Sequence, residues 1–168
     1  MNEVANKEFI HLKIHTQYSI CEGALRITDL AKYCKTNQIR AAGLCDSNNL
    51  CGALEFSELI AKSKTQPIIG TQINIQYKDH IGKIPLFAKD LEGYKNLIKL
   101  SSKSFLEIKD NEEPHCKIED IETHYKGLIL LTGSFDGLIG KLFFKNLASL
   151  HIASGTPQYN YRHNTQEK

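Results

Sequence analysis

The chain has 168 residues, enough for one domain with a core but too few for a core plus a second large module. Its residues are 41% hydrophobic and 24% charged, with 4 prolines and no tryptophan, which excludes the disordered and collagen-like classes. The net charge is only +2, from 21 basic and 19 acidic residues, so no large basic surface is expected and direct DNA binding is not predicted.

The sequence also sets expectations for location. No apolar run approaches the roughly 20 residues that a membrane helix requires. The start, MNEVANKEFIHLK, has no continuous apolar stretch behind a basic cluster, as a secretory signal would. The 5 cysteines form no C-x-x-C pair, which argues against a disulfide framework and a zinc knuckle. We therefore expect a cytoplasmic protein with reduced thiols and no membrane contact.

The first half of the chain predicts alternating strands and helices. Residues 9–16, FIHLKIHT, alternate apolar and polar side chains and predict a first strand. Residues 25–38 carry apolar side chains at helical spacing, and the apolar run at 39–45 predicts a buried strand. A second helix is expected from Leu50 to Ile60, followed by extended segments at 67–70 and 71–77.

The second half repeats this alternation. A strand is expected at 84–88, and Asp90 is placed to cap the helix that follows. The later predicted elements are a polar loop at 109–117, a short helix around 118–125, a strand at 127–131, a turn at 132–137 and a helix at 138–145. This alternation favours an α/β architecture with mainly parallel strands.

The two ends of the chain differ from its centre. Residues 146–168 have no sustained period and mix Gly, Pro, Asn, Gln and Ser, so we expect an irregular, poorly ordered tail. Residues 1–8 are a polar lead. The sequence therefore places the domain at residues 9–145.

Polar side chains gather on one face of the first expected strand. His11, Lys13 and His15 project to one side, whereas Leu12 and Ile14 point to the other. The two histidines, with Glu22 nearby, could begin a zinc or manganese site. The ammonium group of Lys13 would repel the cation, so the alternative is that the histidines are structural or vestigial.

Other polar residues carry weaker signals. Asp46 follows an apolar strand and is either a metal-site carboxylate or a turn or helix-cap residue. Gly133 and Gly137 are expected in a tight turn, because no Lys-Ser/Thr pair accompanies them as in a P-loop. The remaining histidines are expected on the surface: His80, His115, His124, His151 and His163.

Five segments, in the same order, resemble motifs of the polymerase and histidinol phosphatase (PHP) domain that begins the bacterial DNA polymerase III alpha subunit. They are HLKIHTQYSICEGA, AAGLCDSNNLCGALEF, KTQPIIGTQINI, KIPLFAKDLEGYKNLIKLSS and KGLILLTGSFDG. The resemblance implies part of a distorted TIM-like barrel of β/α units. Because the family's domain continues well past the equivalent of residue 145, the resemblance also implies a partial, truncated domain.

The same resemblance implies where metal ligands would stand. His15 matches a retained histidine, and Glu22 and Asp46 occupy carboxylate positions, with His11 a further vestigial candidate. Ligands are replaced at five positions: Lys13, Ser47, Gln72, Lys83 and Ser134. Loss of charge and lone pairs at so many positions would abolish a multinuclear hydrolase centre, so no cofactor is expected.

Two functions remain open. The resemblance implies a non-catalytic module of the replicative polymerase, which would contact the remaining alpha-subunit segments or the proofreading subunit. The alternative is a metal-dependent phosphoesterase or 3′–5′ exonuclease-like hydrolase, in which zinc or manganese would activate water. A partial barrel would also leave an unpaired edge strand and uncovered apolar faces, so self-association is expected.

Overall fold

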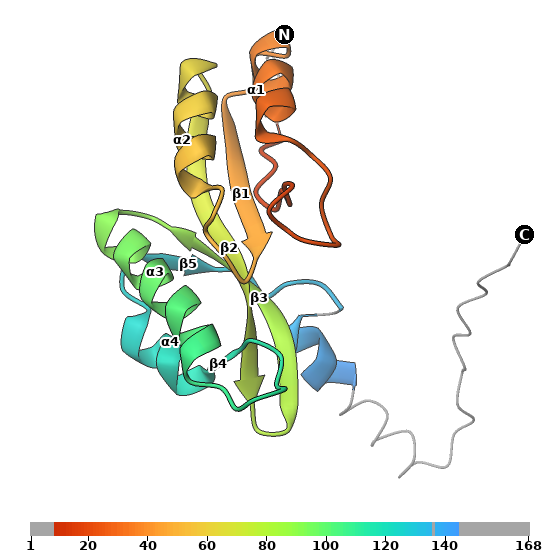
Figure 1. The fold of residues 1–168 in the computed structure, drawn as a ribbon, viewed down its shortest axis with the longest axis vertical. Coiled ribbons are helices and arrows are strands. Elements are labelled where there is room, and N and C mark those ends of the chain that lie inside the picture. The colour runs from red at the N-terminus through yellow and green to blue at the C-terminus, as the bar shows by residue number, and fades with distance from the viewer. Residues whose placement is uncertain (1–8, 136, 145–168) are drawn as a thin grey trace, which may run out of the picture.

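One long strand joins two packed regions in the computed structural model, which describes residues 9–135 and 137–144 (Figure 1). The chain runs in the order α1 (Ile27–Thr36), β1 (Ala41–Ser47), α2 (Ala53–Lys62), β2 (Gln66–Tyr77), β3 (His80–Ala88), α3 (Leu91–Leu106), β4 (Cys116–Lys117), α4 (Ile118–His124) and β5 (Leu128–Leu130). Residues 138–144 are also helical. The predicted α/β class is confirmed in its coarse form, as a sheet packed with helices.

The sheet has the order β1-β2-β3-β5, and β4 pairs with the far end of β2. The β1/β2 and β2/β4 pairs are parallel, but β2/β3 and β3/β5 are antiparallel. The expectation of mainly parallel strands is therefore wrong. Lys78 and Asp79 alone separate β2 from β3, and so short a turn permits only an antiparallel hairpin. Within the described residues the sheet path ends at β1 and β5 and does not close.

The expected first strand is irregular. Ile14 forms an isolated parallel bridge to Leu44, and the N–H of Gly43 donates to the carbonyl of His11 at 2.8 Å, so residues 11–14 do run beside β1. The ladder stops at Thr16, because its N–H donates to the carboxylate of Asp46. A turn follows at residues 17–22.

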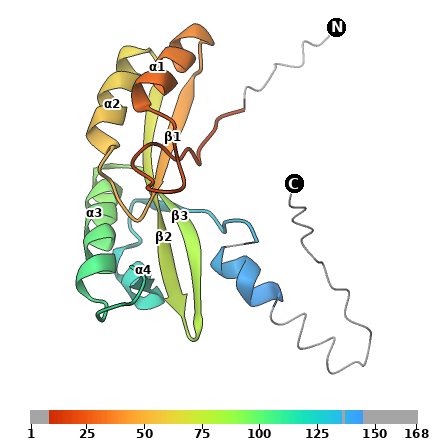
Figure 2. The ribbon, with the colours of Figure 1, turned by 45° about the vertical axis from the view of Figure 1, so that its right-hand side comes forward.

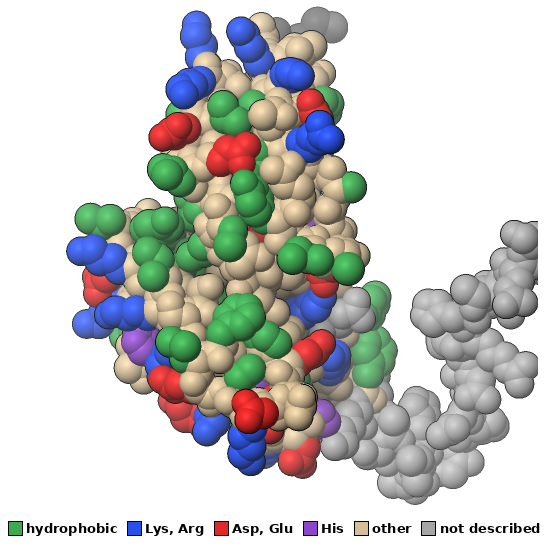
Figure 3. Space-filling model, in the orientation of Figure 1, with side chains coloured by type: hydrophobic (Ala, Val, Ile, Leu, Met, Phe, Trp, Pro, Cys, Tyr) green, Lys and Arg blue, Asp and Glu red, His purple; other side chains and the backbone are tan. Residues whose placement is uncertain are grey.

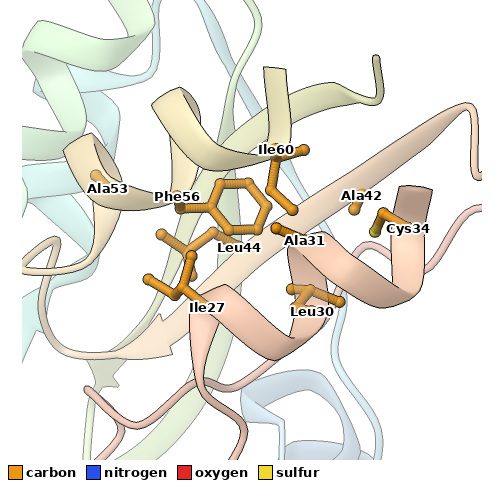
Figure 4. Packing of buried hydrophobic residues seen from close by; sticks show 9 residues of the cluster. All are labelled: Ile27, Leu30, Ala31, Cys34, Ala42, Leu44, Ala53, Phe56 and Ile60. Atoms are coloured by element: carbon orange, nitrogen blue, oxygen red, sulfur yellow. The ribbon is translucent and has the colours of Figure 1, made fainter. Parts of the chain in front are cut away.

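The two packed regions each have a hydrophobic core. In the first, Phe56 and Ile60 of α2 pack against α1 and the inner face of β1 (Figure 4). Full burial of side chains of this size stabilises by about 1.5–3 kcal/mol each. In the second, Ile73 and Ile75 of β2 pack against α3 and α4. Figures 1 and 2 agree that α3 and α4 cover one face of the β2/β3 hairpin, while the helix at 138–144 lies on the other side.

Several predicted elements are confirmed with changed bounds. Asp90 caps α3, since its Oδ1 accepts from the N–H of Gly93 at 2.9 Å. The two extended segments at 67–70 and 71–77 form the single strand β2, and the loop at 109–117 ends in the short strand β4. The predictions for residues 1–8, 145 and 146–168 lie outside the described residues. None of the helices in the described part of the chain is long and apolar enough to cross a membrane.

Candidate functional site

A pocket of about 230 Å³ forms where the segment at 13–22, the β2/β3 hairpin and the residues Gly133, Ser134 and Gly137 meet. Six of the residues expected at the site line it: Lys13, His15, Glu22, Gln72, Lys83 and Ser134. Gly133 and Gly137 complete the lining. Residues spread over more than 100 positions of sequence are thus gathered into one pocket.

The hairpin register determines which side chains reach this pocket. Ile73 pairs with Ile84, and both are buried against α3. Neighbouring residues of a strand point to opposite faces, so Gln72 and Lys83 emerge on the face away from α3. An isolated bridge between Lys83 and Gly137 brings Gly137 against the same face.

Glu22 is the most heavily engaged side chain of the pocket. Its Oε1 lies 2.5 Å from the Nζ of Lys83, and its Oε2 accepts a hydrogen bond from the hydroxyl of Ser47. The Nδ1 of His15 is 3.9 Å from the same Oε2. The hydrogen bonds from Lys83 and then Ser47 hold the pKa of Glu22 below its usual value. Both carboxylate oxygens are therefore committed to partners within the chain.

His15 lies beside this ion pair. Its Nδ1 is 3.2 Å from the Oγ of Ser19. Burial, followed by the positive charge of Lys13, lowers the pKa of His15 from its usual 6.5, against the opposing effect of Glu22 and Asp46. These effects together favour the uncharged form of the imidazole.

Asp46 lies behind the pocket and does not line it. Its buried carboxylate accepts from the N–H of Thr16 at 2.6 Å, from the Thr16 hydroxyl at 2.7 Å and from the Ser19 hydroxyl at 2.6 Å. It holds the turn at 16–19 and caps no helix, because α2 begins at Ala53, seven residues later, with Gly52 as its N-cap. Sequence reasoning missed Thr16 and Ser19 as its partners; their only signal was two hydroxyls in the turn after an expected strand.

Gln72 presents an unmet hydrogen-bonding group. The residue is only 3% exposed, and its Oε1 is buried with no hydrogen-bond partner in the described residues. A buried acceptor without a partner is costly, by about 1–3 kcal/mol. The pocket beside it therefore offers a favourable place for a polar ligand or an ordered water.

The other expected histidines are not brought to the pocket. His11 is exposed and packs edge-on against Phe9, with ring centroids 4.8 Å apart. His115 was expected on the surface but is buried, and its ring nitrogens contact the Glu113 carbonyl at 2.8 Å and the Gln76 side chain at 3.2 Å. The Nδ1 of His124 lies 3.0 Å from the carbonyl of Asp120. His151 and His163 lie outside the described residues.

The pocket fits a catalytic metal centre poorly. Across residues 9–135 and 137–144, no group of three or more His, Cys, Asp or Glu side chains is arranged to hold an ion. The ammonium group of Lys83 already neutralises Glu22, and Lys13 lines the same pocket. A cation entering here would be repelled by both lysines. No hydrolytic step through a metal-bound water follows from this geometry.

Comparisons with known proteins identify a family and several relatives. The family described as the PHP domain matches residues 11–163. The DNA polymerase III subunit alpha of Rickettsia felis is 42% identical over 135 residues, which is 80% of this chain and 11% of that protein. The subunit of the same name from Caulobacter vibrioides is 34% identical over 151 residues, 85% of this chain and 13% of that protein. The chain thus spans little more than a tenth of the length of these curated relatives.

A solved structure gives a weaker similarity. An amidohydrolase from Chromobacterium violaceum superposes with a TM-score of 0.44 at 18% identity, covering 56% of this chain and 34% of that one. This similarity is too low to support a conclusion, so the family assignment rests on the sequence comparisons.

Proposed function

Since the chain belongs to the PHP domain family, we propose that it is the PHP portion of a bacterial replicative DNA polymerase III alpha subunit and serves DNA replication through structure or partner binding. The identity of up to 42% to proteins named DNA polymerase III subunit alpha supports this. We place the partial PHP domain at residues 9–145, in the cytoplasm, and assign it no polymerase active site. The barrel of the family would then be completed by further polypeptide.

The ion pair between Lys83 and Glu22 carries the non-catalytic part of this proposal. The Nζ of Lys83 lies 2.5 Å from Oε1 of Glu22, so a fixed ammonium group supplies the positive charge that a metal ion would otherwise bring. In the proposed vestigial site, His15, Glu22, Asp46 and the more distant His11 remain. The positions that no longer ligate are Lys13, Ser47, Gln72, Lys83 and Ser134. We expect no cofactor.

Exposed apolar side chains support a partner-binding role. Ile129 and Leu130 lie on β5, which ends the described sheet, and Phe135, Phe143 and Phe144 are exposed nearby in sequence. Phe135 and Phe144 contact each other, with ring centroids 5.3 Å apart. Figure 3 shows hydrophobic side chains at the surface on the side of the helix at 138–144. Exposed apolar groups of this kind mark contact surfaces. The remaining alpha-subunit segments, the proofreading subunit or a second copy of the chain would contact this surface.

Metal analysis tests the non-catalytic role. Protein purified without chelator should contain far less than one zinc or manganese per chain by plasma mass spectrometry. It should not hydrolyse nitrophenyl phosphate esters or shorten 3′-labelled DNA, with or without added Mn²⁺. Equimolar metal whose removal abolishes turnover would instead establish the phosphoesterase or exonuclease-like alternative.

Coexpression tests the partner-binding role. The chain should be captured by the remaining alpha-subunit polypeptide or by the proofreading subunit. The exchange Phe135→Ser should weaken that capture, because Phe135 is 75% exposed. The matched control is Phe105→Ser, which removes an exposed phenyl group from α3. The proposal would be contradicted if both variants were captured equally, or if the unaltered chain were not captured at all. Self-association is measured separately, by gel filtration at several protein concentrations.

A further inference from the structure

An apolar stripe runs along the outer face of α3. The inner face of this helix is buried in the second core, but Leu91 and Ile98 are 68% and 44% exposed. A helix turns by about 100° per residue, so Leu91, Tyr94 and Ile98, spaced i, i+3 and i+7, lie on one side. Two serines, at 101–102, end this stripe before Phe105. The stripe therefore has the spacing of a helix–helix contact.

A groove of about 460 Å³ lies beside the start of this stripe. β2 pairs with β3 only from Gly70 onward, so residues 66–69 of β2 leave space next to α3. Ile68, Leu91 and Tyr94 line the groove, whose walls are mainly apolar. Figure 3 shows hydrophobic side chains gathered over the start of α3, with basic side chains next to them. The groove and the stripe meet at Leu91 and Tyr94 and form one continuous surface, which we call the α3 surface.

Positive charge flanks the α3 surface. Lys89 lines the groove, and the helical turn places the exposed Lys95 and Lys99 on the other side of the stripe. None of these three lysines makes an ion pair with another residue in the described part of the chain. Glu92 is also exposed here, and the carboxylate of Asp90 is engaged in capping α3. Three unpaired lysines against two carboxylates, one of them engaged, leave an excess of positive charge.

We infer that the α3 surface is a docking site for an amphipathic helix of a partner polypeptide that carries acidic side chains. The apolar face of that helix would lie along the stripe and the groove, and its carboxylates would face Lys95 and Lys99. A second copy of the chain would add the same excess of positive charge, so an acidic partner fits better.

The α3 surface is separate from the exposed phenylalanines near β5. Figures 1 and 2 place α3 on one face of the β2/β3 hairpin and the helix at 138–144 on the other side. The inference therefore goes beyond the partner contacts proposed above and can fail without them.

Fluorescence anisotropy on the full 168-residue chain tests this inference with designed peptides. The probe is a labelled peptide of three heptads with leucine at positions a and d and glutamate at e and g, where like charges keep the peptide from pairing with itself. Saturable binding is expected. Two controls should bind about tenfold more weakly or not at all: the same peptide with lysine in place of glutamate, and one with the same composition in scrambled order. Equal binding of either control, or no binding of the acidic peptide, would overturn the inference.

A variant of the stripe locates the apolar contact. Ile98→Ser should weaken binding of the acidic peptide about tenfold, because the peptide can no longer bury the isoleucine side chain. The matched control, Phe105→Ser, removes an exposed apolar side chain from the same helix beyond the two serines and should leave binding unchanged. Equal weakening by both variants, or no weakening by Ile98→Ser, would place the contact elsewhere.

A second pair of variants tests the charges. Lys95→Gln combined with Lys99→Gln should weaken binding and reduce its dependence on salt. Lys35→Gln combined with Lys64→Gln removes the same charge from the ends of α1 and α2 and should change neither quantity. Identical effects of the two double variants would indicate general charge attraction and would overturn the acidic character of the partner.

A spectroscopic measurement on the unaltered chain needs no variant. The acidic peptide should shift the backbone amide resonances of Ile68 and of residues 91–98 and leave those of β5 unchanged. Shifts confined to β5 and residues 138–144 would overturn the inference. Gel filtration covers the remaining occupant: if the unaltered chain is a dimer that Ile98→Ser converts to a monomer, a second copy occupies the α3 surface and the partner helix is excluded.

Discussion

Asp46 accepts hydrogen bonds from both the backbone N–H and the side-chain hydroxyl of Thr16, 30 residues earlier in the chain. A third bond, from the Ser19 hydroxyl, completes the set. These bonds connect the end of β1 to the turn that carries His15 and Glu22 toward the pocket. The shape of the pocket thus depends on a carboxylate that does not line it.

Asp46→Asn should lower the free energy of unfolding by about 2–4 kcal/mol. The new NH₂ group would face the donors of Thr16 and Ser19, and hydrogen bonds to a buried charged group would be lost. Urea denaturation measures the loss. Asp29→Asn, on the exposed first turn of α1, should change stability by less than about 0.5 kcal/mol. A loss at position 46 no larger than at position 29 would mean that the bonds to Thr16 contribute little.

Gly43 explains why the N-terminal segment can lie so close to β1. A methyl group on its Cα would stand 2.4 Å from the carbonyl oxygen of Leu12. The backbone of Leu12 cannot move aside as a flexible side chain could. Gly43→Ala should therefore lower the free energy of unfolding by about 1–3 kcal/mol and displace residues 9–18. Hydrogen exchange should rise in that segment and stay low in α3. Unchanged protection of residues 11–16 would contradict the close approach.

The helices could be predicted because their signals are local. The apolar spacing of Ile27, Leu30 and Cys34 gave the buried face of α1, and Asp90 marked the start of α3. The β2/β3 hairpin could not be predicted in the same way. Its turn, Lys78 and Asp79, contains no glycine, although Lys78 adopts a φ of 53°. The alternation of strands and helices therefore suggested a parallel sheet where the chain forms a hairpin.

The site was predicted unevenly for a similar reason. Resemblance to the family's motifs named six of the eight residues that line the pocket, but it also named Ser47 and Asp46, which do not line it. The partners of Asp46 and the burial of His115 depend on tertiary contacts that no local pattern records. The alternation of side chains along residues 11–15 correctly placed Lys13 and His15 on the opposite face from Ile14. It could not show that His11, on the same face as Lys13 and His15, lies outside the pocket.

The five cysteines should react in two classes. Cys21 and Cys51 are exposed, whereas Cys34, Cys45 and Cys116 are buried. Burial raises the pKa of Cys45 and of Cys116 to about 12, so almost no reactive thiolate forms at these two sites near neutral pH. Ellman's reagent should titrate two thiols rapidly and all five only after unfolding, with the labelled peptides identified by mass spectrometry. Rapid labelling of Cys116 in folded protein would show that the second core opens readily.

The ion pair of Glu22 and Lys83 should make the free energy of unfolding fall as the pH is lowered. Hydrogen bonds from Lys83 and Ser47 hold the pKa of Glu22 below its usual 4.5, so the folded state favours the ionised carboxylate. The resulting stabilisation is fully present above about pH 4.5, the value in the unfolded chain, and is lost as the pH falls through the lower folded pKa.

The test compares the unaltered chain with Glu22→Gln in urea between pH 7 and pH 3. The stability difference should be only about 0.2–1 kcal/mol at pH 7, because the pair is partly exposed and screened by water, and it should shrink below pH 4.5 and in high salt. In a chain that also carries Lys83→Gln, the exchange Glu22→Gln should change the stability less, because Glu22 has already lost its main partner, Lys83. A difference that grows on acidification, or that persists unchanged without Lys83, would show that Glu22 is stabilised by some other group.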